Sequence, residues 1–270
     1  MTKFAVKMLR ALVRLAKGFY LFWMFCLFGA AIVFGLAVVV PVVFIVNRLG
    51  GHSFKRMQRV IRRAFSGFLA LLRLGRLARS LPARGAVMDE PCVLVANHPG
   101  LFDVLFLIRD LPGVSVLVKD SLFPWMGPIL VSAGYVPARA RAGSFPSRKP
   151  LRDAARLLKA GHRFIVFPEG TRSPEGGLHP FGPWAVEAAR LADVPLQPVV
   201  IHNRPPFLSH EQRWYYPPYP VSLFQLEFLQ PVRPDGDRRE VMNGIKEDIR
   251  LRLESRGSMR TSSHDQEHAA

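Results

Sequence analysis

A run of 28 residues without a charged side chain, at positions 19–46, constrains this chain more than any other feature. A helix needs about 20 apolar residues to cross the hydrocarbon core of a bilayer. The run is also about twice as long as the apolar part of a secretory signal peptide, and no small-residue cleavage pattern follows it. We therefore predict an N-terminal membrane-embedded helical segment that is retained in the protein.

Positive charge is concentrated around this run. Positions 1–88 hold fifteen Lys and Arg and no Asp or Glu, while the remainder holds twenty-two basic and twenty acidic residues. More basic residues follow the run than precede it, which favours a cytoplasmic location for the rest of the chain, at the inner membrane of the cell. Pro41 and several small residues leave two topologies open, a single span or a re-entrant hairpin.

Residues 52–81 are predicted to form a basic amphipathic helix, which completes an N-terminal membrane region at 1–85. The apolar side holds Phe54, Met57, Ile61, Phe65, Phe68 and Leu72, and the other side holds mainly Arg59, Arg62, Arg63, Arg73 and Arg76. Such a helix can lie among lipid headgroups, where apolar burial and attraction to anionic lipid act together. Basic faces also bind nucleic acid, but the chain has no nucleic-acid motif, so we expect the membrane as partner.

From about residue 86 the pattern changes to short apolar runs that alternate with helical stretches. This alternation predicts an α/β domain over residues 86–254, with a largely parallel central sheet flanked by helices. Strands are expected at 93–96, 114–118, 135–137, 163–167, 195–201 and 221–229, and helices at 102–108, 122–133, 150–160, 181–192 and 241–254. Residues 255–270 are polar, and we expect a disordered tail there.

His98 and Asp103 follow the first of these apolar runs, at the sequence Asn97-His98-Pro99-Gly100. We expect His98 at the end of a strand and Asp103 in the first turn of the next helix. The carboxylate can then accept the Nδ1–H of the imidazole and leave Nε2 as a general base. A surface pair without catalytic function is the alternative, and these two residues alone do not decide between the two.

Polar side chains also follow two other predicted strands, at 134–139 and 169–172. Because the carboxyl ends of parallel strands share one edge, we expect His98, Asp103, Arg139, Glu169 and Arg172 to surround one pocket. The remaining histidines show no metal-ligand spacing, so no metal site is predicted. Cys26 and Cys92 lie in apolar runs and indicate neither a disulfide framework nor a zinc site.

Four motifs in this order resemble those of the glycerolipid acyltransferases, the group that includes lysophosphatidic acid acyltransferase. They are Asn97 with His98-x4-Asp103, Gly134-Tyr135-Val136-Pro137-Ala138-Arg139, Phe167-Pro168-Glu169-Gly170-Thr171-Arg172-Ser173, and Val194-Pro195-Leu196-Gln197-Pro198-Val199. The third motif is the most specific. The resemblance covers about residues 90–201.

The resemblance implies that His98 deprotonates an acceptor hydroxyl while Asp103 orients it. The oxygen then attacks the thioester of an acyl-CoA or an acyl-carrier protein directly, without a cofactor or a covalent acyl-enzyme. Cys92, the alternative nucleophile, is better explained as a buried structural thiol. Substrate contacts are expected from Asn97, Lys119, Arg139, Glu169, Gly170, Thr171 and Arg172, with Arg139 on a phosphate and backbone N–H groups near Gly170 on the oxyanion.

The expected reaction is acyl transfer to a lysophospholipid in phospholipid biosynthesis, most simply to 1-acyl-sn-glycerol-3-phosphate, giving phosphatidic acid. Many family members carry a lysine and a glycine soon after the phenylalanine that follows the third motif, whereas here the run is Phe181-Gly182-Pro183-Trp184, which leaves the head group open. Two alternatives therefore remain. One is the same chemistry on another lyso-lipid, such as a lyso-ornithine lipid, and the other is a non-catalytic module that binds anionic lipid.

Overall fold

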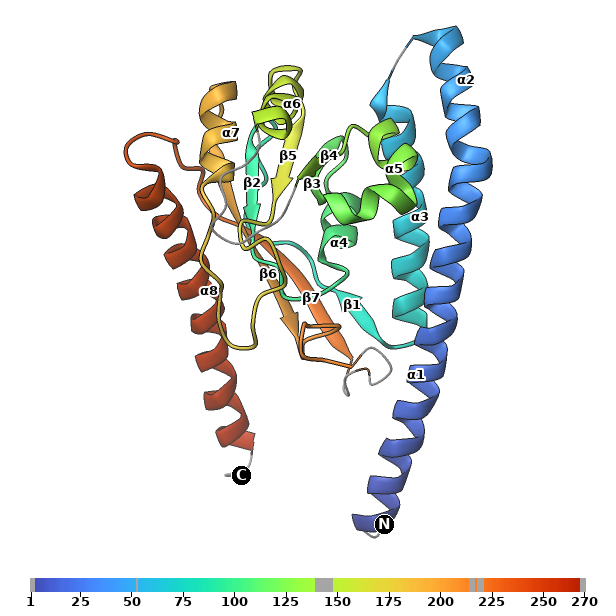
Figure 1. Cartoon of the computed structure of the whole chain (residues 1–270). Helices are drawn as coiled ribbons and strands as arrows, with labels where there is room; N and C mark the ends of the chain where they lie inside the picture. The colour runs from blue at the N-terminus through green and yellow to red at the C-terminus, as the bar shows by residue number, and fades with distance from the viewer. Residues whose placement is uncertain (1–2, 52, 139–147, 214–216, 218–220, 268–270) are drawn as a thin grey trace.

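The computed structural model describes residues 3–51, 53–138, 148–213, 217 and 221–267 (Figure 1). The helices are α1 (Lys3–Phe34), the π-helical η1 (Gly35–Val39), α2 (Val40–Gly50), α3 (Phe54–Leu74), α4 (Asp103–Asp110), the 3₁₀ turn η2 (Asp120–Leu122), α5 (Phe123–Ser132), α6 (Arg148–Lys159), α7 (Trp184–Ala192) and α8 (Arg238–Glu267). The strands are β1 (Ala78–Ser80), β2 (Val93–Ala96), β3 (Val114–Lys119), β4 (Val136–Ala138), β5 (Arg163–Val166), β6 (Leu196–Arg204) and β7 (Ser222–Phe228).

The strands form one seven-stranded sheet in the order β1-β7-β6-β2-β5-β3-β4. The five strands from β6 to β4 are parallel, whereas β7 is antiparallel to β6 and pairs in parallel with β1. Helices α6, α7 and α8 cover one face, and α3, α4 and α5 cover the other, with α1 and α2 outermost (Figure 1). The predicted α/β fold with a largely parallel sheet is confirmed.

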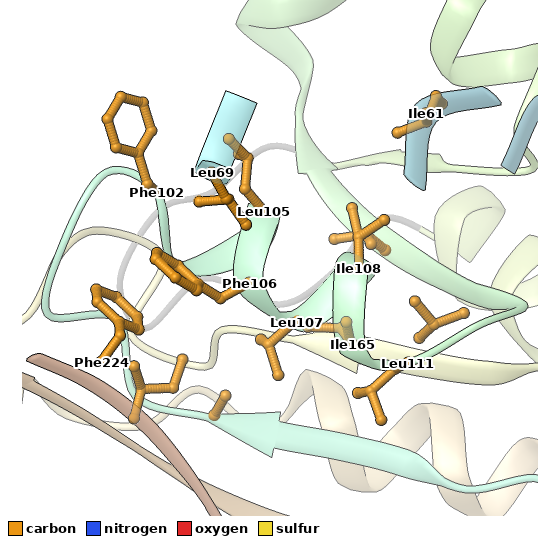
Figure 2. Packing of buried hydrophobic residues seen from close by; sticks show 14 of the residues in the cluster. Ile61, Leu69, Phe102, Leu105, Phe106, Leu107, Ile108, Leu111, Ile165 and Phe224 are labelled. Carbon is orange, nitrogen blue, oxygen red and sulfur yellow. The ribbon is translucent and has the colours of Figure 1, made fainter. Parts of the chain in front are cut away.

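The central strands are buried on both faces, which explains their unbroken apolar runs. On β2, Leu94 and Ala96 join the core beneath α3 and α4, while Val93 and Val95 join the core beneath α6 and α7. Figure 2 shows the first of these cores, where the apolar side of α4 meets residues of α3 and β7. The Phe106 and Phe224 rings stack there with centroids 3.9 Å apart, so α4 and the helix start that carries Asp103 are fixed on the sheet.

The N-terminal segment is one continuous helical run from Lys3 to Gly50. Its residues Lys7–Gly50 are long and apolar enough to cross a membrane, and most of their surface is exposed. One side packs on protein, because Leu21, Met24 and Val43 are buried and the Tyr20 hydroxyl donates to the Leu71 carbonyl at 2.9 Å. The re-entrant hairpin within 19–46 is therefore not formed. The chain reverses only after Gly50, and α3 returns beside α1 (Figure 1).

Two predicted boundaries need correction. The amphipathic helix ends at Leu74, not at 81, because Arg76 takes a left-handed φ of +51° and the Leu77 N–H donates back to the Leu72 carbonyl at 2.9 Å, which closes the helix end. The next residues, Ala78–Ser80, already belong to the sheet, so the α/β domain begins before residue 86. At the other end, α8 continues to Glu267 through part of the predicted disordered tail, since extending an existing helix needs no new nucleation.

Candidate active site

His98 and Asp103 form a hydrogen-bonded pair at the carboxyl edge of the parallel strands. The turn after β2 carries His98 and leads into α4, whose first residue is Asp103. The His98 Nδ1 and the Asp103 Oδ2 are 2.8 Å apart, and the Gly100 N–H donates to the same oxygen at 2.7 Å. With Nδ1–H donated to Asp103, Nε2 keeps its lone pair, and 20% of the His98 side chain is exposed. The predicted contact between base and carboxylate is present.

Asp103 is fully buried, and this burial raises the pKa of its carboxyl above the ordinary value. The hydrogen bond from His98, the Gly100 N–H and the charge of Arg172 act in the opposite direction by favouring the ionised form. Among the residues that the structure describes, the Asp103 Oδ1 has no hydrogen-bond partner. The hydrogen bonds of the carboxylate therefore all act through Oδ2, the oxygen that holds His98.

Glu169 joins the loop after β5 to the turn that carries His98. Its Oε1 accepts hydrogen bonds from the Ser173 hydroxyl at 2.6 Å and from the His98 N–H at 3.2 Å, and its Oε2 accepts one from the His179 N–H at 2.8 Å. The Ser173 N–H also donates to the His98 carbonyl at 2.8 Å. Glu169 is fully buried and both of its oxygens have protein partners, so in this structure it holds the turn that carries His98 and does not face the space where a substrate contact was predicted.

Two residues near His98 were missing from the predicted site. The Phe167 ring stacks on the imidazole, with centroids 4.4 Å apart, and Ser173 binds the His98 backbone as described. Both lie in the third motif, Phe167 to Ser173, so their motif membership was the available signal. The sequence does not predict their contacts with His98, which lies about seventy positions earlier in the chain.

The other residues of the third motif have different environments. The Arg172 Nη1 donates to the carbonyls of Leu208 and Ser209, at 2.8 and 3.0 Å, so this half-buried side chain holds the loop after β6 while its charge acts on Asp103. Thr171 is exposed. Gly170 has a φ of +69°, the left-handed region that favours glycine. Its N–H donates to the Phe167 carbonyl at 3.1 Å and so closes the turn instead of facing an oxyanion.

Asn97 is also corrected from a substrate ligand to a structural residue. Its side chain is 1% exposed, its Nδ2 donates to the Ile201 carbonyl at 3.1 Å, and its Oδ1 accepts from the Ile201 N–H at 2.7 Å. These two bonds continue the pairing of β2 with β6 beyond the last strand residue. Asn97 therefore fixes the strand end from which His98 projects.

The two predicted phosphate ligands have separate outcomes. Lys119 is the last residue of β3, is exposed, and lies at the same carboxyl edge as His98, with β5 between their strands. Arg139 lies outside the described residues.

The Cys92 thiol is buried, and burial raises its pKa to about 11, so it is a poor nucleophile. Within the described residues, no three His, Cys, Asp or Glu side chains are grouped as metal ligands.

The chain is similar to known acyltransferases in sequence and in fold. Residues 76–202 match the family model described as Acyltransferase. The crystal structure of the 1-acyl-sn-glycerophosphate acyltransferase from Thermotoga maritima has a TM-score of 0.66 to this chain, covers 91% of this chain and 97% of its own, and is 24% identical in sequence. At this identity, the likeness shows that the two proteins share a fold.

Three curated relatives are similar in sequence. The chloroplastic 1-acyl-sn-glycerol-3-phosphate acyltransferase of Brassica napus is 30% identical over 179 residues, which cover 62% of this chain and 51% of the relative. The 1-acyl-sn-glycerol-3-phosphate acyltransferase alpha of Mus musculus is 31% identical over 170 residues, which cover 60% of this chain and 56% of the relative. The lyso-ornithine lipid O-acyltransferase of Pseudomonas aeruginosa is 29% identical over 204 residues, covering 67% and 76%.

The chain spans about half the length of the first two of these relatives. The residues that the family model matches include all four motifs. The family model, the relatives and the shared fold support the resemblance to the glycerolipid acyltransferases, a group that includes the 1-acyl-sn-glycerol-3-phosphate acyltransferases.

Proposed function

We propose that this protein transfers a fatty acyl group from an acyl thioester to the free hydroxyl of a lysophospholipid, namely 1-acyl-sn-glycerol-3-phosphate, and so produces phosphatidic acid. The observation that carries the proposal is the His98–Asp103 pair at the carboxyl edge of the sheet, with the exposed Lys119 at the same edge. Two relatives with this printed activity support the choice of acceptor.

In the proposed reaction, the acceptor hydroxyl donates its proton to the His98 Nε2 as its oxygen attacks the thioester carbonyl. The C–O bond forms, the C–S bond breaks, and the imidazolium returns the proton to the departing thiolate. Asp103 stabilises the imidazolium and holds its orientation through Nδ1. Glu169 and Ser173 hold the backbone of His98, so the base does not need to reorganise during the reaction.

The acyl donor is proposed to be acyl-CoA or an acyl-carrier protein, and no cofactor is needed. A thioester is already activated toward a hydroxyl nucleophile, so a positioned base supplies the remaining chemistry, typically about 10²- to 10⁴-fold in rate. Lys119 and Arg139 are proposed to bind the acceptor phosphate, because cationic side chains recognise phosphate oxygens. Thr171 is the member of the third motif whose exposure allows a substrate contact.

A lyso-ornithine lipid is the second candidate acceptor. The relative with this printed activity is covered over 76% of its length, more than the first two relatives, although its identity is 29%. The altered stretch Phe181–Trp184 lies directly after the loop that Glu169 organises, since the His179 N–H donates to Glu169. Acyl-transfer chemistry and the His98–Asp103 pair are the same for both acceptors.

We further propose that the protein acts at the inner membrane with its catalytic domain in the cytoplasm. The exposed apolar helix Lys7–Gly50 supports membrane attachment. The excess of basic residues after this helix supports the cytoplasmic side. A lipid acceptor and a thioester from the cytoplasm would then meet at the membrane surface.

The experiment that tests the function is acyl transfer in purified membranes that carry the wild type or His98→Ala. Labelled acyl-CoA and acyl-carrier protein are supplied separately, with 1-acyl-sn-glycerol-3-phosphate, a lyso-ornithine lipid and larger lysophospholipids as acceptors. We expect labelled phosphatidic acid from the wild type alone. Acylation of another acceptor in its place would keep the chemistry and overturn the head group, and no transfer to any acceptor would overturn the enzyme assignment.

The phosphate ligands are tested in the same assay with Lys119→Ala and Arg139→Ala. We expect each variant to raise the KM for the acceptor while the KM for the thioester stays close to wild type. An acceptor KM that does not change would remove the residue from the phosphate site.

A further inference from the structure

The catalytic domain exposes an apolar helix of its own, α5. The helix has the sequence FPWMGPILVS, without a charged residue. Its inner side is buried through Gly127 and Leu130, yet Trp125 is 77% exposed and Val131 is 58% exposed. Leu122, directly before the helix, is 44% exposed. A helix that is apolar on both sides is stable where neither side meets water.

The helix α6 shows that this exposure is not general in the domain. It lies on the opposite face of the sheet, buries Ala154 and Leu158, and exposes Arg152, Arg156 and Lys159 to solvent. This is the usual division between a core side and a charged solvent side. The outer side of α5 therefore lacks the charges that would keep it in water.

The position of α5 indicates what covers it. It packs against η1 and α2 of the long N-terminal helix (Figure 1), and a Cβ atom on Gly35 would lie 3.1 Å from the Ile129 Cδ1. On that long helix, Val38, Val42 and Ile45 are exposed. The apolar exterior of α5 therefore extends the apolar exterior of the candidate membrane helix.

We propose that α5 is a second membrane-contact element, which places Leu122, Trp125 and Val131 in the interfacial layer of the lipid bilayer. Tryptophan is suited to this layer, because its ring is apolar and its N–H can reach water or headgroups. A protein partner bound to α5 would also have to cover the apolar surface of the adjoining N-terminal helix. A lipid bilayer covers both surfaces at once. The catalytic domain itself thus touches the membrane, through the helix that follows β3 and the short turn η2.

This inference rests on the membrane location of the N-terminal helix and not on the identity of the acceptor. It is tested with single cysteines in the full-length chain, in a Cys26→Ala background. Cys92 stays in place because it is buried and its pKa is raised to about 11, so it reacts poorly with thiol reagents. Nitroxide labels are attached to Trp125→Cys, to Trp23→Cys on the N-terminal helix, and to Leu191→Cys on α7, the matched exposed control.

The labelled proteins are reconstituted in vesicles of phosphatidylcholine and phosphatidylglycerol. Collisions with lipid-soluble oxygen and with a water-soluble nickel complex are then compared. We expect the labels at 125 and 23 to favour oxygen and the label at 191 to favour nickel. A label at 125 that favours nickel overturns the proposal: if 23 still favours oxygen, the N-terminal anchor stands, and if 23 also favours nickel, the anchor fails with it.

Self-association gives a different result in the same experiment. A label at 125 that is shielded from both reagents and broadened by a second label would show that another copy of the chain covers α5. That outcome also overturns the proposal.

A functional comparison uses Trp125→Asp with Val131→Asp, and Leu191→Asp as the matched control. We expect the α5 variant to transfer acyl groups about tenfold more slowly to an acceptor embedded in vesicles, because an apolar anchor is lost. Transfer to a water-soluble short-chain acceptor should stay within about twofold, as should both rates of the control. An unchanged rate on vesicles, or an equal loss on both acceptors, would contradict membrane contact by α5.

Discussion

The pairs His98–Asp103 and His202–Glu227 have nearly the same length, 2.8 and 2.9 Å between nitrogen and oxygen. The first uses the Nδ1 of the imidazole and joins a strand end to a helix start. The second uses Nε2 and joins the antiparallel strands β6 and β7. The His98 side chain is 20% exposed and the His202 side chain 6%.

Their surroundings explain why we assign chemistry to one pair and structure to the other. Glu227 also lies 3.8 Å from the guanidinium of Arg252 on α8, and Arg204 on β6 donates to the Leu253 carbonyl of the same helix. The His202 pair thus lies where α8 meets the sheet. A histidine beside a carboxylate is therefore not sufficient for general-base catalysis, because the second nitrogen must also reach a substrate.

Replacing each histidine by alanine tests the comparison most strongly. We expect His98→Ala to lower acyl transfer by about 10³-fold, because no other base is hydrogen-bonded to Asp103 in the part of the chain that the structure describes. His202→Ala should leave kcat close to wild type while lowering the temperature of unfolding. Both are measured in detergent-purified protein, by label transfer and by thermal unfolding. Comparable losses of kcat would break the distinction between the pairs.

Replacing Asp103 and Glu227 by their amides distinguishes a carboxylate that orients a catalytic histidine from one that only stabilises the fold. Asp103→Asn should lower kcat by about 10²-fold or more, because the amide can hold the wrong imidazole tautomer, with little change in the acceptor KM. Glu227→Gln is the matched control and should keep kcat. A loss confined to the acceptor KM in Asp103→Asn would assign Asp103 to substrate binding.

Glu169→Gln sharpens the role of the loop that supports His98. The amide keeps the shape of Glu169 but weakens three hydrogen bonds that a carboxylate accepts, including the one from the His98 N–H. We expect kcat to fall by about tenfold while the acceptor KM changes little. A raised acceptor KM at unchanged kcat would restore the predicted substrate contact.

The smallest expected effect is a difference in stability with pH. Since burial raises the pKa of Asp103 above the value in the unfolded chain, the native state binds more protons between the two values. The free energy of unfolding should therefore fall as pH rises from the unfolded pKa to the folded pKa, and then level off. Asp103→Asn should lack this decline. Thermal unfolding of both proteins across acidic pH measures it, and parallel curves would contradict a raised pKa.

The fold was predictable where apolar runs are long and bounded by turn residues. Every strand expected from such a run is present, and β7 at 222–228 lies within the predicted 221–229. The strand β1 was not predicted, because Ala78-Arg79-Ser80 has no apolar run and forms through pairing with the distant β7. A three-residue strand that depends on a partner far along the chain leaves no local signal.

The same distinction between local and distant contacts applies to the site. His98 and Asp103 are close in sequence, so a strand end and a helix start suffice to predict their meeting. For Glu169 and Asn97, residue type alone does not show whether an oxygen faces a ligand or a backbone N–H. The structure decides this, because the partners come from other segments, His98 and His179 for Glu169 and Ile201 for Asn97.

The π-helical segment Gly35–Val39 sets the rotational phase of the N-terminal helix. Met24 before it and Val43 after it are both buried. Val43 lies 19 residues after Met24. Five turns of an uninterrupted α-helix take about 18 residues, so Val43 would point about 100° away from Met24 around the helix axis. A π-helical turn accommodates one additional residue and removes this offset. One additional residue therefore lets the continuous helical run keep the same side toward the protein along both halves.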